Sequence, residues 1–257
     1  MIACGAMVSA QAFAEWPEPI EFWTDAAATS EVVDHGEWQA FLDEYLVVAE
    51  DGVNRVRYDA AREAAAPGLY RYLRDMATLD PRQLSRDEQM AYWINLYNAL
   101  TVRVVLENPG KNSIRRMGGF FSIGPWGEPV VRIEGRDLSL DDIEHRILRP
   151  IWQDHRIHFA VNCASIGCPN LMGEAFRGDN LERLLDAGEQ SYLQHARGFD
   201  REDNGKIHLS SIFKWYRQDF APDEDGVLRY VERTLGLDAG LLGGRVSYDY
   251  DWLLNAI

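Results

Sequence analysis

The sequence predicts a mixed α/β fold, namely a helix-rich single domain with a small central sheet. Segments with helical periodicity outnumber extended segments. The extended segments come one at a time between helices, which is typical of the mixed class. The chain of 257 residues can bury a large core, and no Pro- or Ser-rich linker divides it. We therefore expect one domain rather than two.

The expected helices carry capping residues or apolar residues three and four positions apart. They cover 37–50, 60–79 with a break at Pro67, 85–107, 138–149, 178–196, 210–220 and 227–235. Ser85, followed by Glu88, is a strong start for the third of these. That helix is apolar nearly all round, so we expect it to be buried at the centre of the domain. Its polar exceptions, Asn95 and Asn98, either bond to the backbone of a neighbouring loop or line a site.

The expected strands are short and lie at 54–58, 129–134, 156–162, 206–209 and 245–251. The strand at 156–162 is apolar apart from its ends, which indicates burial on both faces. Because side chains alternate along a strand, His158 and Asn162 share one face and Cys163 lies on the other. We therefore expect the neighbouring imidazole to point away from Cys163.

The chain is acidic, with a formal net charge of -15 at pH 7. This charge repels phosphate backbones, so we expect no nucleic-acid binding. We interpret the acidity as a source of solubility. On this interpretation, Asp141, Asp142 and Glu144 are the charged start of a helix, and 219–225 is a solvated turn. Beyond the first residues, no apolar run approaches the ~18–20 residues that a membrane span needs.

The first residues, 1–14, resemble a secretory signal rather than part of the fold. An apolar run at 2–8 precedes a small-residue cleavage pattern that ends at Ala14. We expect the mature protein to begin at Glu15 and to be extracytoplasmic, either periplasmic or secreted. Cleavage would remove Cys4 and leave a pair of cysteines in an oxidising compartment.

That pair, Cys163 and Cys168, lies at the end of the 156–162 segment and allows several kinds of site. A disulfide is one, since four intervening residues can bring the Cα atoms within the required ~4.4–6.8 Å. A reactive thiol is another. A zinc site with His158 is a third, although the spacing fits no compact zinc motif. The two cysteines also fit as unpaired thiols packed in the core.

If the site is catalytic, we expect Cys163 to be the nucleophile of an acyl transfer or amide hydrolysis. His145 or His158 would be the base, and Asn162 or Asn95 would donate to the oxyanion. The substrate would be a small molecule or a peptide-like ligand. We expect no metal and no cofactor, because the chain contains no motif for either.

The alternative is a binding module without catalysis. In that case Cys163 and Cys168 form a disulfide that fixes one loop. A Gly-rich loop with Phe120, Phe121 and Trp126 would then contact a partner.

Motifs in a fixed order give the chain a familiar pattern: AYWINLYNAL at 91–100, LSLDDIEHRILR at 138–149, HFAVNCASIGCP at 158–169, IFKWYRQDF at 212–220 and YDYDWLLN at 248–255. Together they resemble the family called domain of unknown function 547. The resemblance implies a family domain over 85–257, with 15–84 as a helical region packed on it. It implies no established reaction, and its pattern points to Asn95, Asn98, Glu144, His145, His158, Asn162, Cys163 and Cys168.

Overall fold

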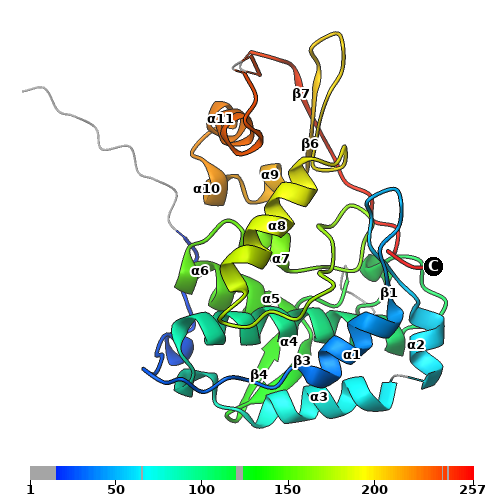
Figure 1. Ribbon diagram of the computed structural model, residues 1–257, viewed down its shortest axis with the longest axis vertical. Coiled ribbons are helices and arrows are strands. Elements are labelled where there is room, and N and C mark those ends of the chain that lie inside the picture. Colours follow the sequence, from blue (N-terminus) through cyan, green and yellow to red (C-terminus); the bar gives the residue numbers. More distant parts are fainter. Residues whose placement is uncertain (1–15, 65, 120–123, 239, 242) are drawn as a thin grey trace, which may run out of the picture.

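Helix α4 (Arg86–Glu107) runs through the middle of the fold, as the sequence predicted (Figure 1). The Ser85 hydroxyl accepts a hydrogen bond from the backbone N–H of Glu88 and so fixes where the helix begins. Nearly all of its side chains are buried, because the helix is apolar on every side. The computed structural model describes residues 16–64, 66–119, 124–238, 240–241 and 243–257. The expected signal segment, 1–14 with Cys4, lies outside the described residues.

The N-terminal region consists of helices α1 (Gly36–Tyr45), α2 (Tyr58–Ala64) and α3 (Ala66–Thr78). Helices α2 and α3 pack against α4, and α1 packs against α3. The predicted helix at 60–79 is therefore two helices. Pro67 is the second residue of α3, where a proline fits because the first turn has no partner for its N–H.

Within the described residues, the strands form three separate small sheets. They are the antiparallel pairs β1 (Leu46–Val47) with β2 (Arg55–Val56) and β3 (Pro129–Ile133) with β4 (Arg136–Ser139), and a sheet of β5 (Phe199–Arg201), β6 (Ile207–Ser210) and β7 (Val246–Asp249). In the last sheet β6 is antiparallel to β5 and parallel to β7, with Leu209 opposite Tyr248. The predicted helix-rich, mixed α/β domain is confirmed.

The predicted helix at 138–149 forms in three joined pieces: α5 (Leu140–Ile143), the π-helical turn η4 (Glu144–Leu148) and α6 (Arg149–Trp152). Ser139 and Asp142 form a capping box at its start, in which each side chain bonds the other's backbone N–H. A π-helical turn is wider than an α-helical one, and such turns are frequent at functional sites. Here the wide turn begins at Glu144.

The predicted strand at 156–162 is wrong. Residues Ile157–Ala160 form a single helical turn, α7, in which the N–H of Val161 bonds to the carbonyl of Ile157. An apolar run this short does not distinguish a buried strand from a buried helical turn, because both are apolar all round. The helical turn also removes the reason for placing His158 and Cys163 on opposite faces.

The remaining helices are α8 (Leu181–Leu193), α9 (Ile212–Trp215), α10 (Arg217–Phe220) and α11 (Glu224–Leu235), with short 3-10 turns η1 (Glu21–Trp23), η2 (Pro81–Gln83) and η3 (Ile114–Arg116). The predicted helix at 210–220 is interrupted at Tyr216, whose backbone is not helical. Helix α8 packs against α7 and α11. Within the described part of the chain, no helix is both long and apolar enough to cross a bilayer.

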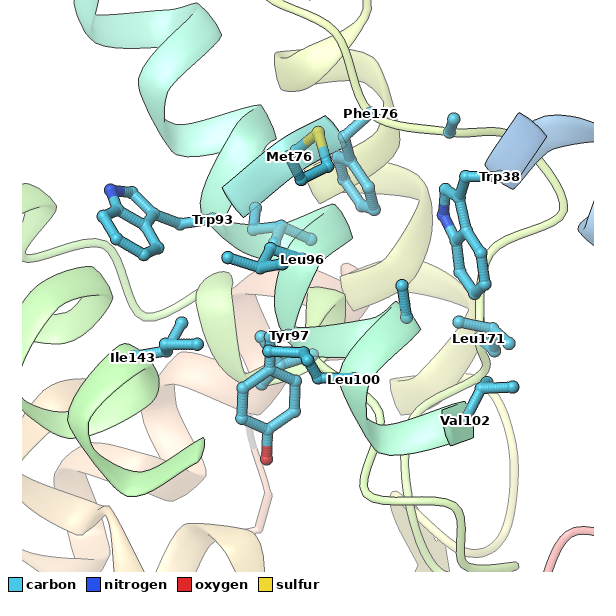
Figure 2. Close-up of a cluster of buried hydrophobic side chains, with 14 of the residues drawn as sticks. Trp38, Met76, Trp93, Leu96, Tyr97, Leu100, Val102, Ile143, Leu171 and Phe176 are labelled. Atoms are coloured by element: carbon cyan, nitrogen blue, oxygen red, sulfur yellow. The ribbon is translucent and has the colours of Figure 1, made fainter. Parts of the chain in front are cut away.

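Among the residues that the structure describes, the core contains two hydrophobic clusters. The larger one surrounds α4, and Figure 2 shows part of it, with Trp93 projecting from the helix and Trp38, Met76 and Phe176 coming from other segments. The smaller one joins α7, α8, α9, α11 and the sheet that contains β6. In Figure 2 the hydroxyl of Tyr97 points away from the other labelled side chains of the larger cluster.

Candidate functional site

A cavity of about 270 Å³ is lined by residues from both core clusters. Tyr97 and Val161 come from the larger cluster, and Ile212 comes from the smaller one. Several of the predicted site residues also line this cavity: Glu144, His145, His158, Cys163 and Cys168. The structure therefore brings together side chains that the sequence placed on two separate segments.

Cys163 and Cys168 are free thiols in this structure, the first partly buried and the second buried. Their sulfur atoms lie 2.9 Å apart, which is longer than the ~2.05 Å of a disulfide bond. The Cys163 sulfur also lies 3.1 Å from the Ser165 hydroxyl oxygen and 3.1 Å from the Tyr250 hydroxyl oxygen. It is thus surrounded by groups that can donate hydrogen bonds to a thiolate.

These contacts shift the pKa values of the two thiols in opposite directions. The hydrogen bond from Cys168, with those from Ser165 and Tyr250, lowers the pKa of Cys163, although burial opposes the shift. Burial, with the hydrogen bond to Cys163, raises the pKa of Cys168 well above its usual value. Burial and the neighbouring thiols also raise the pKa of Tyr250, so its hydroxyl remains a donor. Cys163 is therefore the thiol that ionises first.

The asparagines position the loop that carries the thiols. The Asn162 side chain donates to the Pro169 carbonyl at 2.7 Å and accepts from the Ala164 N–H at 2.8 Å. Asn98, on α4, donates to the Ala160 carbonyl at 2.9 Å and accepts from the Asn162 N–H at 2.8 Å. The loop is therefore fastened to the central helix just before Cys163.

Asn95 has the same role for a different segment, since its amide bonds both the carbonyl and the N–H of Phe176. For Asn95 and Asn98 the structure thus favours bonding to a loop backbone over lining a site. Neither they nor Asn162 are among the described residues that line the cavity. The expected contacts of Asn95 and Asn98 with a ligand, and of Asn162 or Asn95 with an oxyanion, have no support in this geometry.

The C-terminal segment runs alongside the cysteine loop. The N–H of Ile166 donates to the Leu253 carbonyl, and the N–H of Gly167 donates to the Asp251 carbonyl, each at 2.8 Å. A Cβ on Gly167 would lie 2.7 Å from the backbone nitrogen of Asp251, so only glycine permits this approach. The pairing holds Tyr250 against the thiols.

His158 is held by a hydrogen bond to a buried carboxylate, Asp219, which also forms an ion pair with Arg149. Its Nε2 atom lies 2.7 Å from Oδ2 of Asp219, which also accepts from Nε of Arg149 at 2.7 Å. Burial lowers the pKa of His158, although the bond to Asp219 opposes this shift. Burial alone would raise the pKa of Asp219, but its bonds to His158 and Arg149 outweigh burial and lower it. At neutral pH the pair is therefore a neutral imidazole beside a carboxylate.

Asp219 was expected to begin a solvated turn, and this prediction is wrong. Its side chain is 0% exposed and binds Arg149 through both carboxylate oxygens. Arg149 comes from α6, 70 residues earlier in the chain, so no local pattern indicates the contact. The motif at 212–220 was the only sequence signal for this residue.

A comparison with protein families matches residues 81–193 to the family described as "Protein of unknown function, DUF547". This stretch of the chain is similar to the DUF547 family. The resemblance inferred from the motifs is therefore confirmed for this stretch, while the motifs at 212–220 and 248–255 lie beyond the match. No curated protein and no solved structure matches the chain.

The DUF547 stretch supplies the thiols, His145 and His158, and residues beyond it complete the site. Asp219 orients His158, and Tyr216 stacks on the same imidazole with ring centroids 4.2 Å apart. Tyr250 bonds to the Cys163 sulfur. The motifs at 212–220 and 248–255 contain Tyr216, Asp219 and Tyr250, but no local pattern indicated a role in the site for these residues.

His145, on the π-helical turn of the DUF547 stretch, lies at a less buried part of the cavity. Its Nδ1 atom is 3.3 Å from a guanidinium nitrogen of Arg149 and 3.8 Å from Oε1 of Glu144. Its Nε2 atom is 3.8 Å from Oδ1 of Asp141. Among the described residues neither His145 nor His158 forms a hydrogen bond with either sulfur.

Two further predictions concern metal binding and the aromatic loop. Within the described part of the chain, no group of three or more His, Cys, Asp or Glu side chains is arranged as a metal site. Phe120 and Phe121 lie outside the described residues. Trp126, from the same loop, lines the cavity and meets Trp252 edge-on, with ring centroids 5.8 Å apart.

Proposed function

We propose that the cavity is the site of a thiol-dependent acyl transfer or amide hydrolysis on a small or peptide-like substrate, with Cys163 as the nucleophile. The observation that carries the proposal is the setting of the Cys163 sulfur. It borders the cavity and has hydrogen-bonding partners in Cys168, Ser165 and Tyr250, all within 3.1 Å. These bonds favour the thiolate, which is the nucleophilic form of the side chain.

His158 is the proposed general base and acid. Because Asp219 is a carboxylate, the neutral imidazole carries its proton on Nε2, and Nδ1 is left as an acceptor. Asp219 is thus a third group that orients the base. Many enzymes with a thiol or hydroxyl nucleophile activate it through such an arrangement of nucleophile, base and orienting group. His145 lines the same cavity and is the second candidate for this role.

Tyr97 is the proposed donor to the oxyanion. It lines the cavity, and none of the described residues forms a hydrogen bond with its hydroxyl. Burial holds the pKa of Tyr97 well above its usual value, so the hydroxyl stays protonated. A fixed, unpaired donor in a cavity is the kind of group that stabilises a developing oxyanion.

The proposed reaction has two steps. The imidazole takes the proton of the Cys163 thiol, and the resulting thiolate attacks the carbonyl carbon. A C–S bond forms, the C–N or C–O bond breaks, and the amine or alcohol leaves with the proton that the imidazole took from the thiol. Water, or an acceptor amine in the transfer reaction, then attacks the thioester carbon, its proton passes to the imidazole, and the C–S bond breaks. The acyl group leaves as a carboxylic acid or an amide.

An acylation experiment tests the proposal. Incubation with p-nitrophenyl acetate is expected to add one acetyl group to Cys163, detected by intact mass and peptide mapping and removed by hydroxylamine. Cys163→Ser should lose this adduct, whereas Cys168→Ser, which keeps the nucleophile, should retain it. An adduct that is absent from the wild type, or unchanged in Cys163→Ser, would contradict the proposal.

The second candidate is a binding module without catalysis, in which Cys163 and Cys168 form a disulfide. The separation of 2.9 Å between the sulfurs supports it, because oxidation would need only a small movement. Intact mass with and without alkylation separates the two candidates. An oxidised pair in the mature protein would favour the binding module, and two alkylatable thiols would favour the nucleophile.

We also propose that the protein is exported and that residues 1–14 are removed. The apolar run at 2–8 and the cleavage pattern that ends at Ala14 support this. N-terminal sequencing of the protein recovered from a secreting bacterial host is expected to begin at Glu15. Recovery of the full-length chain from the cytosolic fraction alone would contradict export.

A further inference from the structure

We infer that the cavity binds a cationic group of its substrate, an ammonium or a guanidinium, between aromatic rings and the carboxylate of Glu144. This inference rests on the proposed function and names the charge of the substrate. It follows from a buried carboxylate that lacks a cation, a second carboxylate beside it, and a wall of tryptophan and tyrosine rings.

Glu144 is the first part of the argument. Its side chain is only 10% exposed and lines the cavity. Its nearest basic groups are the imidazoles of His145 and His158, 3.8 and 3.9 Å away. No Lys or Arg of the described chain lies within 4.0 Å of its carboxylate. A buried carboxylate normally has a cationic partner, and a ligand cation would supply the one that is missing.

Asp141 adds to the negative potential of the same cavity. Its side chain is half-exposed and precedes Glu144 by three residues, so both carboxylates project from the same side of the helix. Burial, together with the charges of Glu144 and Asp142, raises the pKa of Asp141, although His145 opposes the shift. A bound cation would relieve the repulsion between these carboxylates.

The aromatic wall provides the second surface for a cation. Trp252 lies 4.6 Å from Tyr250 and 5.6 Å from Trp215, measured between ring centroids, and all of them line the cavity. The faces of such rings attract ammonium and guanidinium groups. The Arg115 guanidinium already lies 5.2 Å from the centroid of Trp252, so the protein itself places a cation on this ring.

The size of the cavity limits the ligand. A volume of about 270 Å³ is just below the range of roughly 300–1,000 Å³ that is typical of ligand sites. It suits one amino-acid side chain or a small amine, and the thiol on the same wall would face the acyl group attached to it. We therefore expect the substrate to be an acylated diamine, whose free amino group keeps its charge, or a short peptide with a basic side chain.

A pair of matched ligands tests the inference on the Cys163→Ser protein, in which no acyl transfer can interfere. Nα-acetyl-lysine amide and Nα-acetyl-norleucine amide have the same aliphatic chain, and only the first carries an ammonium group. Titration followed by tryptophan fluorescence or calorimetry is expected to show at least tenfold tighter binding of the lysine amide. Equal affinities, or no saturable binding of the lysine amide, would overturn the inference.

Substitutions test which side chains bind the ammonium group of the lysine amide. In the Cys163→Ser background, Glu144→Gln should weaken binding of the lysine amide about tenfold, while exposed Glu50→Gln should leave it unchanged. Near-ultraviolet circular dichroism reports whether Glu144→Gln folds. Trp215→Ala removes a half-exposed ring and should also weaken binding, even if the Glu144 variant does not fold. Unchanged binding in folded Glu144→Gln and in Trp215→Ala would contradict the inference.

The binding experiment and the acylation experiment test separate claims, so either claim can be contradicted while the other stands. An acetyl adduct on Cys163 without a preference for the lysine amide would keep the proposed function and remove the cation site. A preference for the lysine amide without any adduct would keep the cation site and remove the proposed nucleophile.

Discussion

The Nε2 atom of His158 lies 2.7 Å from Oδ2 of Asp219, 61 residues away in the chain. The same carboxylate binds Arg149 through both of its oxygens. This buried group joins α6, α7 and α10, and it fixes the orientation of the imidazole at the edge of the cavity. Both the stability of the fold and the proposed chemistry depend on it.

Removal of Asp219 should be strongly destabilising. Asp219→Ala would leave the Arg149 guanidinium buried without its partner, which typically costs about 3–5 kcal/mol of unfolding free energy. Asp137→Ala is the control, because Asp137 forms an exposed ion pair with Arg132 and should cost less than about 1 kcal/mol. Urea unfolding measures both values. Similar losses in the two variants would show that the buried pair is not important for stability.

Acid should destabilise the protein through the same pair. The folded state lowers the pKa of His158 below 6.5 and that of Asp219 below 3.8. Both groups therefore bind protons more strongly in the unfolded chain than in the folded one. The contribution of the pair to the free energy of unfolding is fully present above pH 6.5, and it declines as the pH falls through the folded-state pKa of each group. Urea unfolding at a series of pH values should show this decline begin below pH 6.5. The His158 contribution would be contradicted by constant stability between pH 6.5 and 5.

Tyr250→Phe should raise the pKa of the Cys163 thiol. The substitution removes one of the hydrogen bonds that stabilise the thiolate but keeps the ring. The pH profile of alkylation by iodoacetamide is expected to move to higher pH. Tyr248→Phe, which removes an exposed bond to Glu224, should leave the profile unchanged. Identical profiles for the wild type and Tyr250→Phe would show that the hydroxyl does not act on the thiol.

Gly167→Ala should separate the cysteine loop from the C-terminal segment. Its Cβ would lie 2.7 Å from the nitrogen and 2.9 Å from the oxygen of the Asp251 backbone, so the backbone must move. Overpacking of this kind costs about 1–3 kcal/mol. Gly173→Ala is the control, since its Cβ would meet only Leu46 at 3.8 Å. Equal melting temperatures for the two variants would contradict the close approach.

Local sequence patterns predicted the parts of the fold that depend on local interactions. The central helix was predicted because Ser85 supplies its cap and because its residues are apolar all round, and α4 matches that prediction from Arg86 to Glu107. The turn at Ile157–Ala160 was predicted as a strand, since periodicity does not separate the two structures in so short an apolar run. In the fold this turn packs against α8, a contact that no local pattern indicates.

The candidate site was predicted only in part, because local patterns do not show contacts between distant segments. The motif around Cys163 and Cys168 is local, and both thiols line the cavity as expected. Asp219 and Tyr250 reach these groups only through tertiary contacts, and composition alone made the first look like part of a solvated turn. The amides of Asn95 and Asn98 looked equally suited to a ligand or a backbone, and only coordinates distinguish the two.

The rate of alkylation of each thiol in the folded, reduced protein tests the central claim most directly. Peptide mapping after timed exposure to iodoacetamide gives separate rates for Cys163 and Cys168 across a range of pH. Cys163 is expected to react first, with an apparent pKa below the usual 9.0, while Cys168 stays protected. If Cys168 reacted as fast as Cys163, or if Cys163 titrated at or above 9.0, Cys163 would not be an activated nucleophile.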